Sequence, residues 1–95
     1  MSISDIIMFK VQKREVTVYT THSPISSNKP LKYWLDTINS PYFFQPHKSF
    51  IINLQHVLSF DKGNIYLFGN LCAYLTSRKQ NDFKDKMLQI LNILK

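Results

Sequence analysis

Apolar and polar residues alternate with a period of two near the start of the chain, a pattern that predicts antiparallel strands. Residues 3–11 are rich in β-branched and aromatic side chains and predict one strand. After the polar turn residues 12–14, residues 15–21 alternate as a second strand. The two segments together predict a hairpin. The apolar face expected for its first strand consists of Ile7, Phe9 and Val11.

The period changes to that of a helix after a break at residues 22–24 and a short extended piece around Ile25. Residues 26–30 combine capping side chains with a proline suited to the first helical turn. Apolar residues then recur at i, i+3, i+4 and i+7, which predicts a helix with one face in the core. Residues 39–41 end it with Asn-Ser-Pro. The apolar positions are Leu31, Trp34, Leu35 and Ile38.

The clearest hairpin of the chain joins a strand at residues 57–60 to one at residues 65–68. The intervening turn begins with an aspartate, and Gly63 or Asn64 can adopt the positive φ that tight turns require. Before this hairpin, residues 42–44 return to the core. The pattern of residues 48–52 fits a short helical turn and a strand equally well.

A last strand and a last helix are predicted after a second tight turn at Gly69-Asn70. Residues 71–75 form the strand. Helical spacing follows, with Ser77 or Asn81 as a candidate cap and Asp82 in the first turn. The apolar positions of this helix are Phe83, Met87, Ile90, Leu91 and Leu94. The pattern therefore predicts a mainly β protein with two helices, forming one domain over residues 1–95.

The composition indicates the net charge of the protein and the cellular compartment that suits it. The net charge is +6 and the sequence pI is about 9.6, which favours a polyanionic partner, chiefly nucleic acid or an acidic membrane. The one cysteine, Cys72, has no partner for an internal disulfide, which suits a reducing compartment. No apolar run approaches the roughly 18–20 residues of a membrane span, and no signal peptide is evident. We expect a cytoplasmic protein that does not enter a membrane.

Catalysis and metal binding find no support in the residue pattern. The three histidines and the cysteine lack the spacing of metal ligands. His47 and Ser49 lie close in sequence, but no third group orients them and no glycine-rich oxyanion element accompanies them. We therefore expect a protein that is not an enzyme and that uses no cofactor or metal.

Residues 43–53 place a proline, a histidine, a lysine and a serine between two aromatic segments. Polar groups in such a setting are either satisfied inside the protein or face a partner outside it. Facing outward, His47, Lys48 and Ser49 would offer a cation and hydrogen-bonding groups suited to phosphate and base edges.

The order of elements and two sequence blocks resemble the LytTR DNA-binding domain, the output domain of many bacterial response regulators. The blocks are His-Lys-Ser-Phe-Ile-Ile-Asn at residues 47–53 and Ser-Arg-Lys at residues 77–79, within a resemblance that spans about Asp5 to Leu91. The resemblance implies an elongated stack of short antiparallel sheets. It also implies loops that contact successive grooves of double-stranded DNA, usually as a dimer on direct-repeat promoter sites, with a receiver domain upstream in a longer protein.

The resemblance also assigns individual residues. His47 matches the family histidine that contacts bases in one groove, and Arg78 matches the arginine before the last helix that reads the other major groove. Asn70 lies near the hairpin-loop residue that touches DNA between them. Many family members carry an arginine just before the histidine, whereas this chain has Gln45-Pro46, which removes a phosphate or guanine contact.

Each assignment has a plainer structural alternative. Arg78 can bond guanine O6 and N7 with its planar guanidinium, or can pair on the surface with Asp82. His47 can donate to a base or phosphate, or can hold its loop through a backbone hydrogen bond. Lys48 and Lys79 are candidate phosphate contacts that carry no sequence information. The remaining candidates, which are equally ordinary turn formers, are Ser49 and Asn70.

Two other functions remain open from the sequence. One is a basic, β-rich protein-interaction module that docks an acidic partner without sequence-specific DNA binding. The other is single-stranded RNA binding through exposed aromatic side chains. We expect the aromatic residues of the helix and of the central run to be core instead, and Asn53 to bond backbone at a strand end. The aromatic residues expected in the core are Trp34, Phe43, Phe44 and Phe50.

Overall fold

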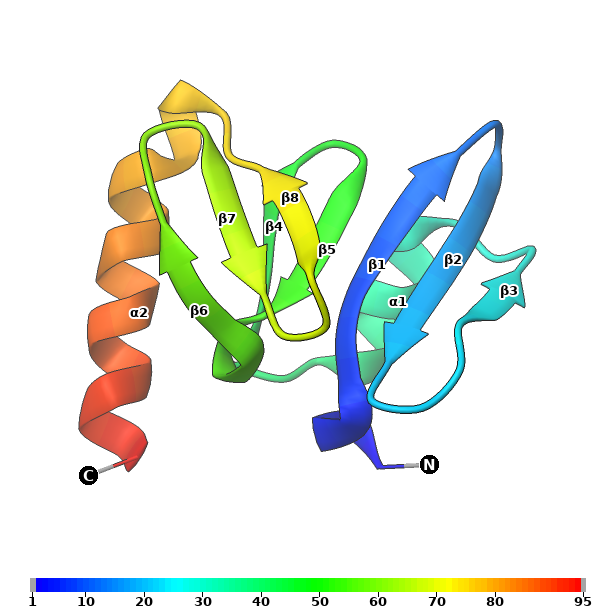
Figure 1. Cartoon of the computed structure of the whole chain (residues 1–95), viewed down its shortest axis with the longest axis horizontal. Helices are drawn as coiled ribbons and strands as arrows, with labels where there is room; N and C mark the ends of the chain where they lie inside the picture. Colours follow the sequence, from blue (N-terminus) through cyan, green and yellow to red (C-terminus); the bar gives the residue numbers. More distant parts are fainter. Residues whose placement is uncertain (1, 95) are drawn as a thin grey trace.

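Within residues 2–94, eight strands form two antiparallel sheets, and two helices flank them (Figure 1). The computed structural model describes residues 2–94, with side chains for residues 2–91. The larger sheet has the strand order β3-β2-β1-β5-β4. Its strands are β1 (Ile6–Gln12), β2 (Glu15–Thr20), β3 (Ile25–Ser27), β4 (Phe43–His47) and β5 (Phe50–Asn53). Residues 48–52, which the pattern left open, thus lie largely in a strand.

The smaller sheet has the order β6-β7-β8 and contains the predicted hairpin. Its strands are β6 (Val57–Phe60), β7 (Asn64–Leu67) and β8 (Leu71–Tyr74). The helices are α1 (Leu31–Ile38) and α2 (Gln80–Leu94), and three short 3-10 turns are η1 (Ile3–Asp5), η2 (Leu54–His56) and η3 (Ser77–Lys79). The predicted mainly β fold with two helices is confirmed. Its extents of 33 × 27 × 26 Å make the elongation modest.

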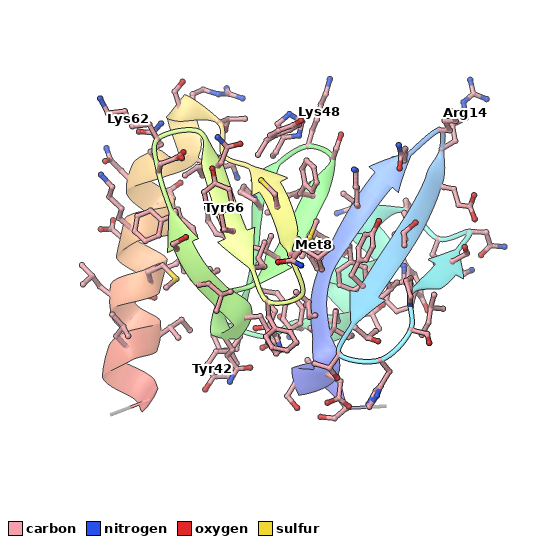
Figure 2. The ribbon with its side chains drawn as sticks, in the orientation of Figure 1. Met8, Arg14, Tyr42, Lys48, Lys62 and Tyr66 are labelled. Carbon is pink, nitrogen blue, oxygen red and sulfur yellow. The ribbon has the colours of Figure 1, made fainter. Side chains whose placement is uncertain are left out.

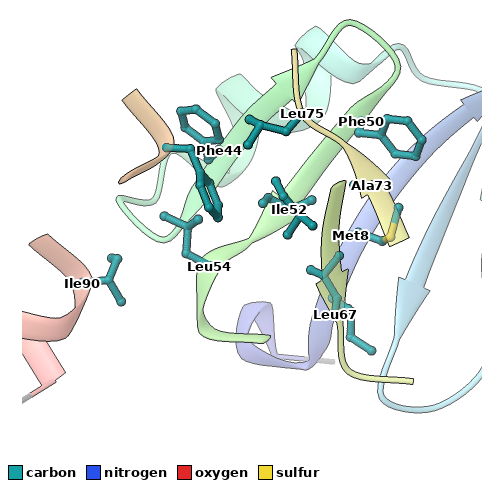
Figure 3. Close-up of a cluster of buried hydrophobic side chains, with 12 residues drawn as sticks. Met8, Phe44, Phe50, Ile52, Leu54, Leu67, Ala73, Leu75 and Ile90 are labelled. Atoms are coloured by element: carbon teal, nitrogen blue, oxygen red, sulfur yellow. The ribbon is translucent and has the colours of Figure 1, made fainter. Parts of the chain in front are cut away.

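Two apolar clusters lie on opposite faces of the five-stranded sheet. On one face α1 packs through Leu31 and Trp34 against Phe9 of β1. On the other face the three-stranded sheet and α2 cover the strands, and Figure 3 shows this second cluster around Ile52 and Leu54. Both clusters include residues of β1, β4 and β5, so burial on the two faces of this sheet fixes the positions of both helices.

The first strand departs from the predicted alternation. Residues 3–5 form a 3-10 turn instead of extended chain, and the β1–β2 register shifts between Ile6 and Met8. Because the shift reverses the facing of later residues, Ile7 packs in the cluster with β7, β8 and α2, while Phe9 packs against α1. The prediction that Ile7 and Phe9 share one face is therefore wrong.

The tight turns lie where the sequence predicts them, but only some of the expected residues have positive φ. Lys13 and Arg14 at the β1–β2 turn have φ of 53° and 66°, a left-handed conformation that is unusual for long side chains. Gly69 and Asn70 also have positive φ, as expected of their turn. In the β6–β7 turn Gly63 does not, and neither does Asn64, because the Asp61 carboxylate holds that turn by accepting hydrogen bonds from their backbone nitrogens.

The predicted helix caps are also only partly right. Pro30 is itself the N-cap of α1, and no side chain caps that end. The Ser27 hydroxyl instead accepts hydrogen bonds from the Lys29 backbone nitrogen and from Trp34 Nε1, both at 3.1 Å. Asn39 ends the helix with a left-handed cap.

The second helix begins at Gln80, so Asn81 lies inside its first turn and is not its cap. Phe83 and Ile90 are buried as predicted, but Leu91 is 53% exposed and does not belong to the core. The side chain of Leu94, also predicted to be apolar core, lies outside the described residues. No helix in residues 2–94 is both long enough and apolar enough to span a bilayer.

Asn53 is a buried polar residue whose side-chain nitrogen and oxygen both form hydrogen bonds. Its side-chain nitrogen donates to the Ile6 carbonyl at 2.8 Å, and its oxygen accepts from the Gln55 backbone nitrogen at 3.0 Å. The predicted structural role at the end of a strand is confirmed. The residue ties β5 to the start of β1 at the edge of the molecule farthest from the loops described next.

Candidate nucleic-acid interface

Basic side chains gather along one edge of the molecule, where the β1–β2, β4–β5 and β6–β7 turns end and η3 leads into α2. Figure 2 shows Arg14, Lys48 and Lys62 pointing away from the fold along this edge. Arg78 and Lys79 belong to η3. We call these five residues the basic edge. The acidic Asp61 and Glu15 lie beside them.

A cavity of about 450 Å³ opens within the basic edge. It brings together two segments that are thirty residues apart in sequence. One comes from β4 and its turn, and the other from η3 and the residue before it. The cavity is lined by Gln45, His47, Lys48, Thr76, Arg78 and Lys79. Four of the six residues that the sequence analysis proposed for DNA contact therefore share one hollow.

The two halves of this cavity are joined through Pro46, which is fully buried. Its carbonyl accepts hydrogen bonds from the Thr76 backbone nitrogen at 3.1 Å and from the Thr76 hydroxyl at 3.3 Å. The β4–β5 register shifts between Phe44 and His47, which accommodates a proline that cannot donate to the ladder. The Gln45-Pro46 pair thus supplies a structural link at the position where the resemblance led us to expect an arginine.

His47 is held in one orientation by its own turn. Its Nδ1 accepts a hydrogen bond from the Ser49 backbone nitrogen at 3.1 Å, so in the neutral ring the proton is on Nε2. The ring packs edge-on against Phe50 at 5.6 Å and Tyr74 at 6.0 Å between centroids. The bond predicted as the structural alternative is present, and it leaves Nε2 as a fixed donor for an external acceptor.

The side chains of Arg78 and Lys79 differ in exposure and in their contacts with the rest of the protein. Arg78 is exposed, and it forms no ion pair with Asp82. Among the residues whose side chains are described, the ion pair recorded is Lys32–Asp36 on α1, at 3.5 Å. Lys79 is half-buried, and its Nζ lies 5.7 Å from the centroid of the Phe44 ring. The guanidinium can therefore reach a partner freely, whereas the ammonium is held against an aromatic face.

Ser49 and Asn70 are not part of the cavity. The backbone of Ser49 is committed to the fold, since its carbonyl accepts from the Val11 nitrogen at 2.9 Å and its nitrogen donates to His47. Asn70 lies at the opposite end of β8 from η3 and lines a separate depression with Lys10. Its contact with DNA remains a prediction, but the structure does not bring it to the basic edge.

The β6–β7 turn is fastened beside η3. The Gln80 side-chain nitrogen donates to the Lys62 carbonyl, which ties the turn to the start of α2. Asp61 accepts from the backbone nitrogens of Gly63 and Asn64 and from the Tyr66 hydroxyl at 3.2 Å. The Gly63 bond in particular lowers the pKa of Asp61 below 3.8, while the bond to Asp61 raises the pKa of Tyr66 above 10.0.

Lys13, Arg14 and Lys62 are basic residues near the site that the sequence analysis did not propose. Strand register places the first two there, because Lys10 pairs with Phe50 and the β1–β2 turn therefore ends beside the β4–β5 turn. The available signal was that two predicted turns, at residues 12–14 and at residues 61–64, each contain a basic residue. Which turns share an edge depends on the strand order, and that order is not readable from a single sequence.

The aromatic residues predicted as core are buried or, for Trp34, half-buried. Other aromatic side chains are exposed. Tyr66 and Tyr74 are 41% and 58% exposed on the outer face of the three-stranded sheet, and Tyr74 extends this face to His47. Within residues 2–91, no cluster of three potential metal ligands occurs.

Comparisons with known proteins bear on the family and the fold of the chain. A sequence model of the LytTr DNA-binding domain matches residues 1–88. Among solved structures, the chain is similar to one described as the LytTr DNA-binding domain of a methyl-accepting/DNA response regulator from Bacillus cereus. That similarity has a TM-score of 0.80 at 12% sequence identity and covers 92% of this chain and 84% of the other. The search of curated proteins returned no match.

Proposed function

Because this chain belongs to the family of LytTR DNA-binding domains, we propose that it recognises specific sequences in double-stranded DNA through the loops of its basic edge and acts in transcription regulation. The observation that carries the proposal is the cavity shared by His47, Lys48, Arg78 and Lys79. It combines an imidazole donor held in one orientation, an exposed guanidinium fork and two ammonium groups. The family itself is one of DNA-binding domains and not of enzymes.

In this proposal the residues divide into two kinds. Arg78 and His47 read bases, since a guanidinium can bond guanine O6 and N7 together and Nε2 can donate to a base acceptor. Lys48 and Lys79 contact phosphates, which fixes the position of the protein without specifying a sequence. Ser49 supports the turn and Asn70 makes a minor contact outside the cavity.

The geometry of the edge supports simultaneous contact with more than one groove. The longest dimension of the protein is 33 Å, close to one turn of B-DNA at about 34–36 Å. Arg14, Lys48 and Lys62 are spread along that dimension (Figure 2). The proposal includes binding as pairs on direct-repeat promoter sites in the cytoplasm, with a receiver domain upstream in a longer protein.

The test is selection of duplexes from a random library, followed by fluorescence anisotropy with the wild type and two single variants. Arg78→Ala should lose about 1–3 kcal/mol of discrimination at one base pair. The variant should then bind duplexes that differ only at that base pair with equal affinity. Lys48→Ala should weaken selected and random duplexes alike and should reduce the slope of log affinity against log salt by about 0.9.

Two results would count against the proposal. Equal affinity of the wild type for selected and random duplexes would remove sequence specificity. Tight binding to an acidic protein, with no binding to any duplex at moderate salt, would instead support the alternative of a protein-interaction module.

A second candidate rests on the exposed Tyr66 and Tyr74. The two lie diagonally on neighbouring strands, because Tyr66 pairs with Cys72 two residues before Tyr74. Bases of single-stranded nucleic acid could stack on this face. Tyr74→Leu should then reduce the affinity for a single-stranded oligonucleotide far more than the affinity for a duplex. Duplex recognition predicts instead that unlabelled single strands compete poorly with a labelled duplex for binding to the wild type.

A further inference from the structure

Gln45 lies in β4, two residues before His47, and its side chain lines the cavity within the basic edge. The residue is half-buried. Its Nε2 donates a long hydrogen bond, of 3.5 Å, to the Lys48 carbonyl across the β4–β5 turn. This bond favours one orientation of an amide that could otherwise rotate, and it identifies which end of the amide is the nitrogen.

The bond to Lys48 leaves one side of the Gln45 amide free. A primary amide carries two N–H groups, one on the side of its oxygen and one on the opposite side. With the opposite N–H directed at the Lys48 carbonyl, the second N–H and Oε1 lie side by side. Among the hydrogen bonds of residues 2–91, none involves this Oε1. The free side of the amide therefore presents one donor next to one acceptor.

The other side chains of the cavity offer few acceptors. Three of the six lining side chains are cations, which donate hydrogen bonds and accept none. Nδ1 of His47 already accepts from a backbone nitrogen. Thr76 is half-buried, and its hydroxyl donates to a backbone carbonyl. Gln45 is thus the lining residue best suited to accept a hydrogen bond from an amino group of a base. The three cations are Lys48, Arg78 and Lys79.

Adenine matches this arrangement of donor and acceptor. In the major groove adenine presents the N6 amino group beside the N7 acceptor, so an amide can accept from N6 and donate to N7 at once. Guanine presents two acceptors, O6 and N7, and would place its O6 against the amide oxygen. Cytosine presents only the N4 donor, and thymine presents an acceptor and a methyl group.

We propose that Gln45 is a specificity-determining residue that recognises an adenine in the major groove, with Oε1 accepting from N6 and Nε2 donating to N7. This inference rests on the proposed DNA binding and names one base of the target sequence. Arg78 is suited to guanine by the same geometric rule, since its guanidinium donates to both O6 and N7. One cavity then recognises two purines through two different side chains.

The adenine should lie close to the base that His47 contacts. Gln45 and His47 are two residues apart in β4. A strand rises about 3.3 Å per residue, and B-DNA rises about 3.4 Å per base along each strand. We therefore expect the adenine within about two base pairs of the position at which His47→Asn loses discrimination.

The first test compares the base preferences of the wild type and three variants after selection from a random duplex library. The wild type should prefer adenine at one position by about fivefold or more, and Gln45→Ala should lose the preference at that position only. Gln45→Glu, which can only accept, should shift the preference toward cytosine, whose N4 donates. Gln45→Arg should shift it toward guanine.

The second test changes the DNA and leaves the wild-type protein intact. The adenine in question is replaced by an analogue that carries C–H in place of N7, so that pairing with thymine and the N6 group are kept and the acceptor is lost. The wild type should bind this duplex about fivefold or more weakly in fluorescence anisotropy. Gln45→Ala should bind both duplexes equally. The wild-type measurement does not depend on the folding of any variant.

Gln55 provides the matched controls, because it is an exposed glutamine in η2, outside the cavity. Gln55→Ala should leave every base preference unchanged. Gln55→Arg adds the same charge as Gln45→Arg and should change affinity for all duplexes alike, without a new preference for guanine. Thermal midpoints of all variants, measured on the same samples, show whether each one is folded.

Two results would overturn the role of Gln45 while leaving recognition by Arg78 intact. One is an unchanged base preference in Gln45→Ala at every position. The other is full wild-type affinity for duplexes in which each adenine of the selected site in turn lacks N7. A wild type that selects no sequence at all would overturn the proposed function instead, so the two failures are distinguishable.

Discussion

Thr76 donates two hydrogen bonds to the carbonyl of Pro46, one from its backbone nitrogen and one from its hydroxyl. This pair connects the segment that ends in His47 to the segment that continues into Arg78. The side chains proposed to read bases are therefore positioned relative to each other by a neutral contact between buried backbone and a half-buried threonine.

Thr76→Val should separate positioning from charge. The substitution keeps shape and the backbone bond but removes the hydroxyl bond, which should lower the free energy of unfolding by about 1 kcal/mol. Discrimination between selected and random duplexes should fall, while the salt slope stays at its wild-type value because no cation is lost. Thr76→Ser, which keeps the hydroxyl, is the matched control, and a lowered salt slope in Thr76→Val would contradict the expectation.

His47 should tolerate asparagine and glutamine differently. Asparagine can place an acceptor near the Nδ1 position and preserve the bond from the Ser49 nitrogen, but it cannot reach outward as Nε2 does. His47→Asn should therefore keep the thermal midpoint and lose duplex affinity. His47→Gln should show the reverse, with a lower midpoint and more retained affinity. Differential scanning fluorimetry and anisotropy on the same samples measure both, and equal losses in the two variants would refute the division of roles.

The two ends of the basic edge should contribute to affinity without contributing to specificity. Arg14→Ala and Lys62→Ala should each reduce affinity for every duplex and reduce the salt slope by about 0.9 per lost phosphate contact. Lys32 is exposed on α1 and paired with Asp36, so Lys32→Ala is the control that removes a positive charge elsewhere. An equal effect of all three variants would indicate that only net charge matters.

The Asp61 carboxylate should make the β6–β7 turn sensitive to acid. Hydrogen bonds from Gly63, Tyr66 and Asn64 lower its pKa below 3.8, so folding favours its deprotonated form. The resulting stabilisation is present above pH 3.8 and is lost as the pH falls through the native pKa. Chemical denaturation at pH 6 and pH 3 should show a smaller loss of stability on acidification for Asp61→Asn than for the wild type. An equal loss would assign the acid sensitivity to other carboxylates.

Most elements of the fold could be predicted because their signals are local. The helical stripe of Leu31 to Ile38 and the hairpin around Asp61 each depend on spacing and turn residues within a few positions, and both are confirmed. The reversal of facing at Ile7 could not be predicted in this way. It arises from a register shift that packs β1 between two layers, and those layers come from distant parts of the chain.

In the candidate site, too, the local motifs could be predicted and the contacts between distant segments could not. The polar run around His47 and the Ser-Arg-Lys block were recognisable as separate motifs, and the cavity they share is formed by contact between β4 and the segment after β8. The linking role of Pro46 could not be foreseen, because a proline between aromatics gives no indication of which distant nitrogen its carbonyl will meet. Arg14 was missed for a similar reason, since its place on the edge follows from strand order.

At the left-handed turn, Lys13 and Arg14 destabilise the fold but supply positive charge for binding a polyanion. Each long side chain in this conformation costs roughly 1–2 kcal/mol relative to a residue that adopts it freely. Lys13→Asn and Arg14→Gly would suit the backbone better and would remove two positive charges from the β1–β2 turn, one of them from the basic edge. Selection for thermal stability alone would therefore be expected to replace these two basic residues. A turn that keeps them indicates that contact with a polyanion is under selection.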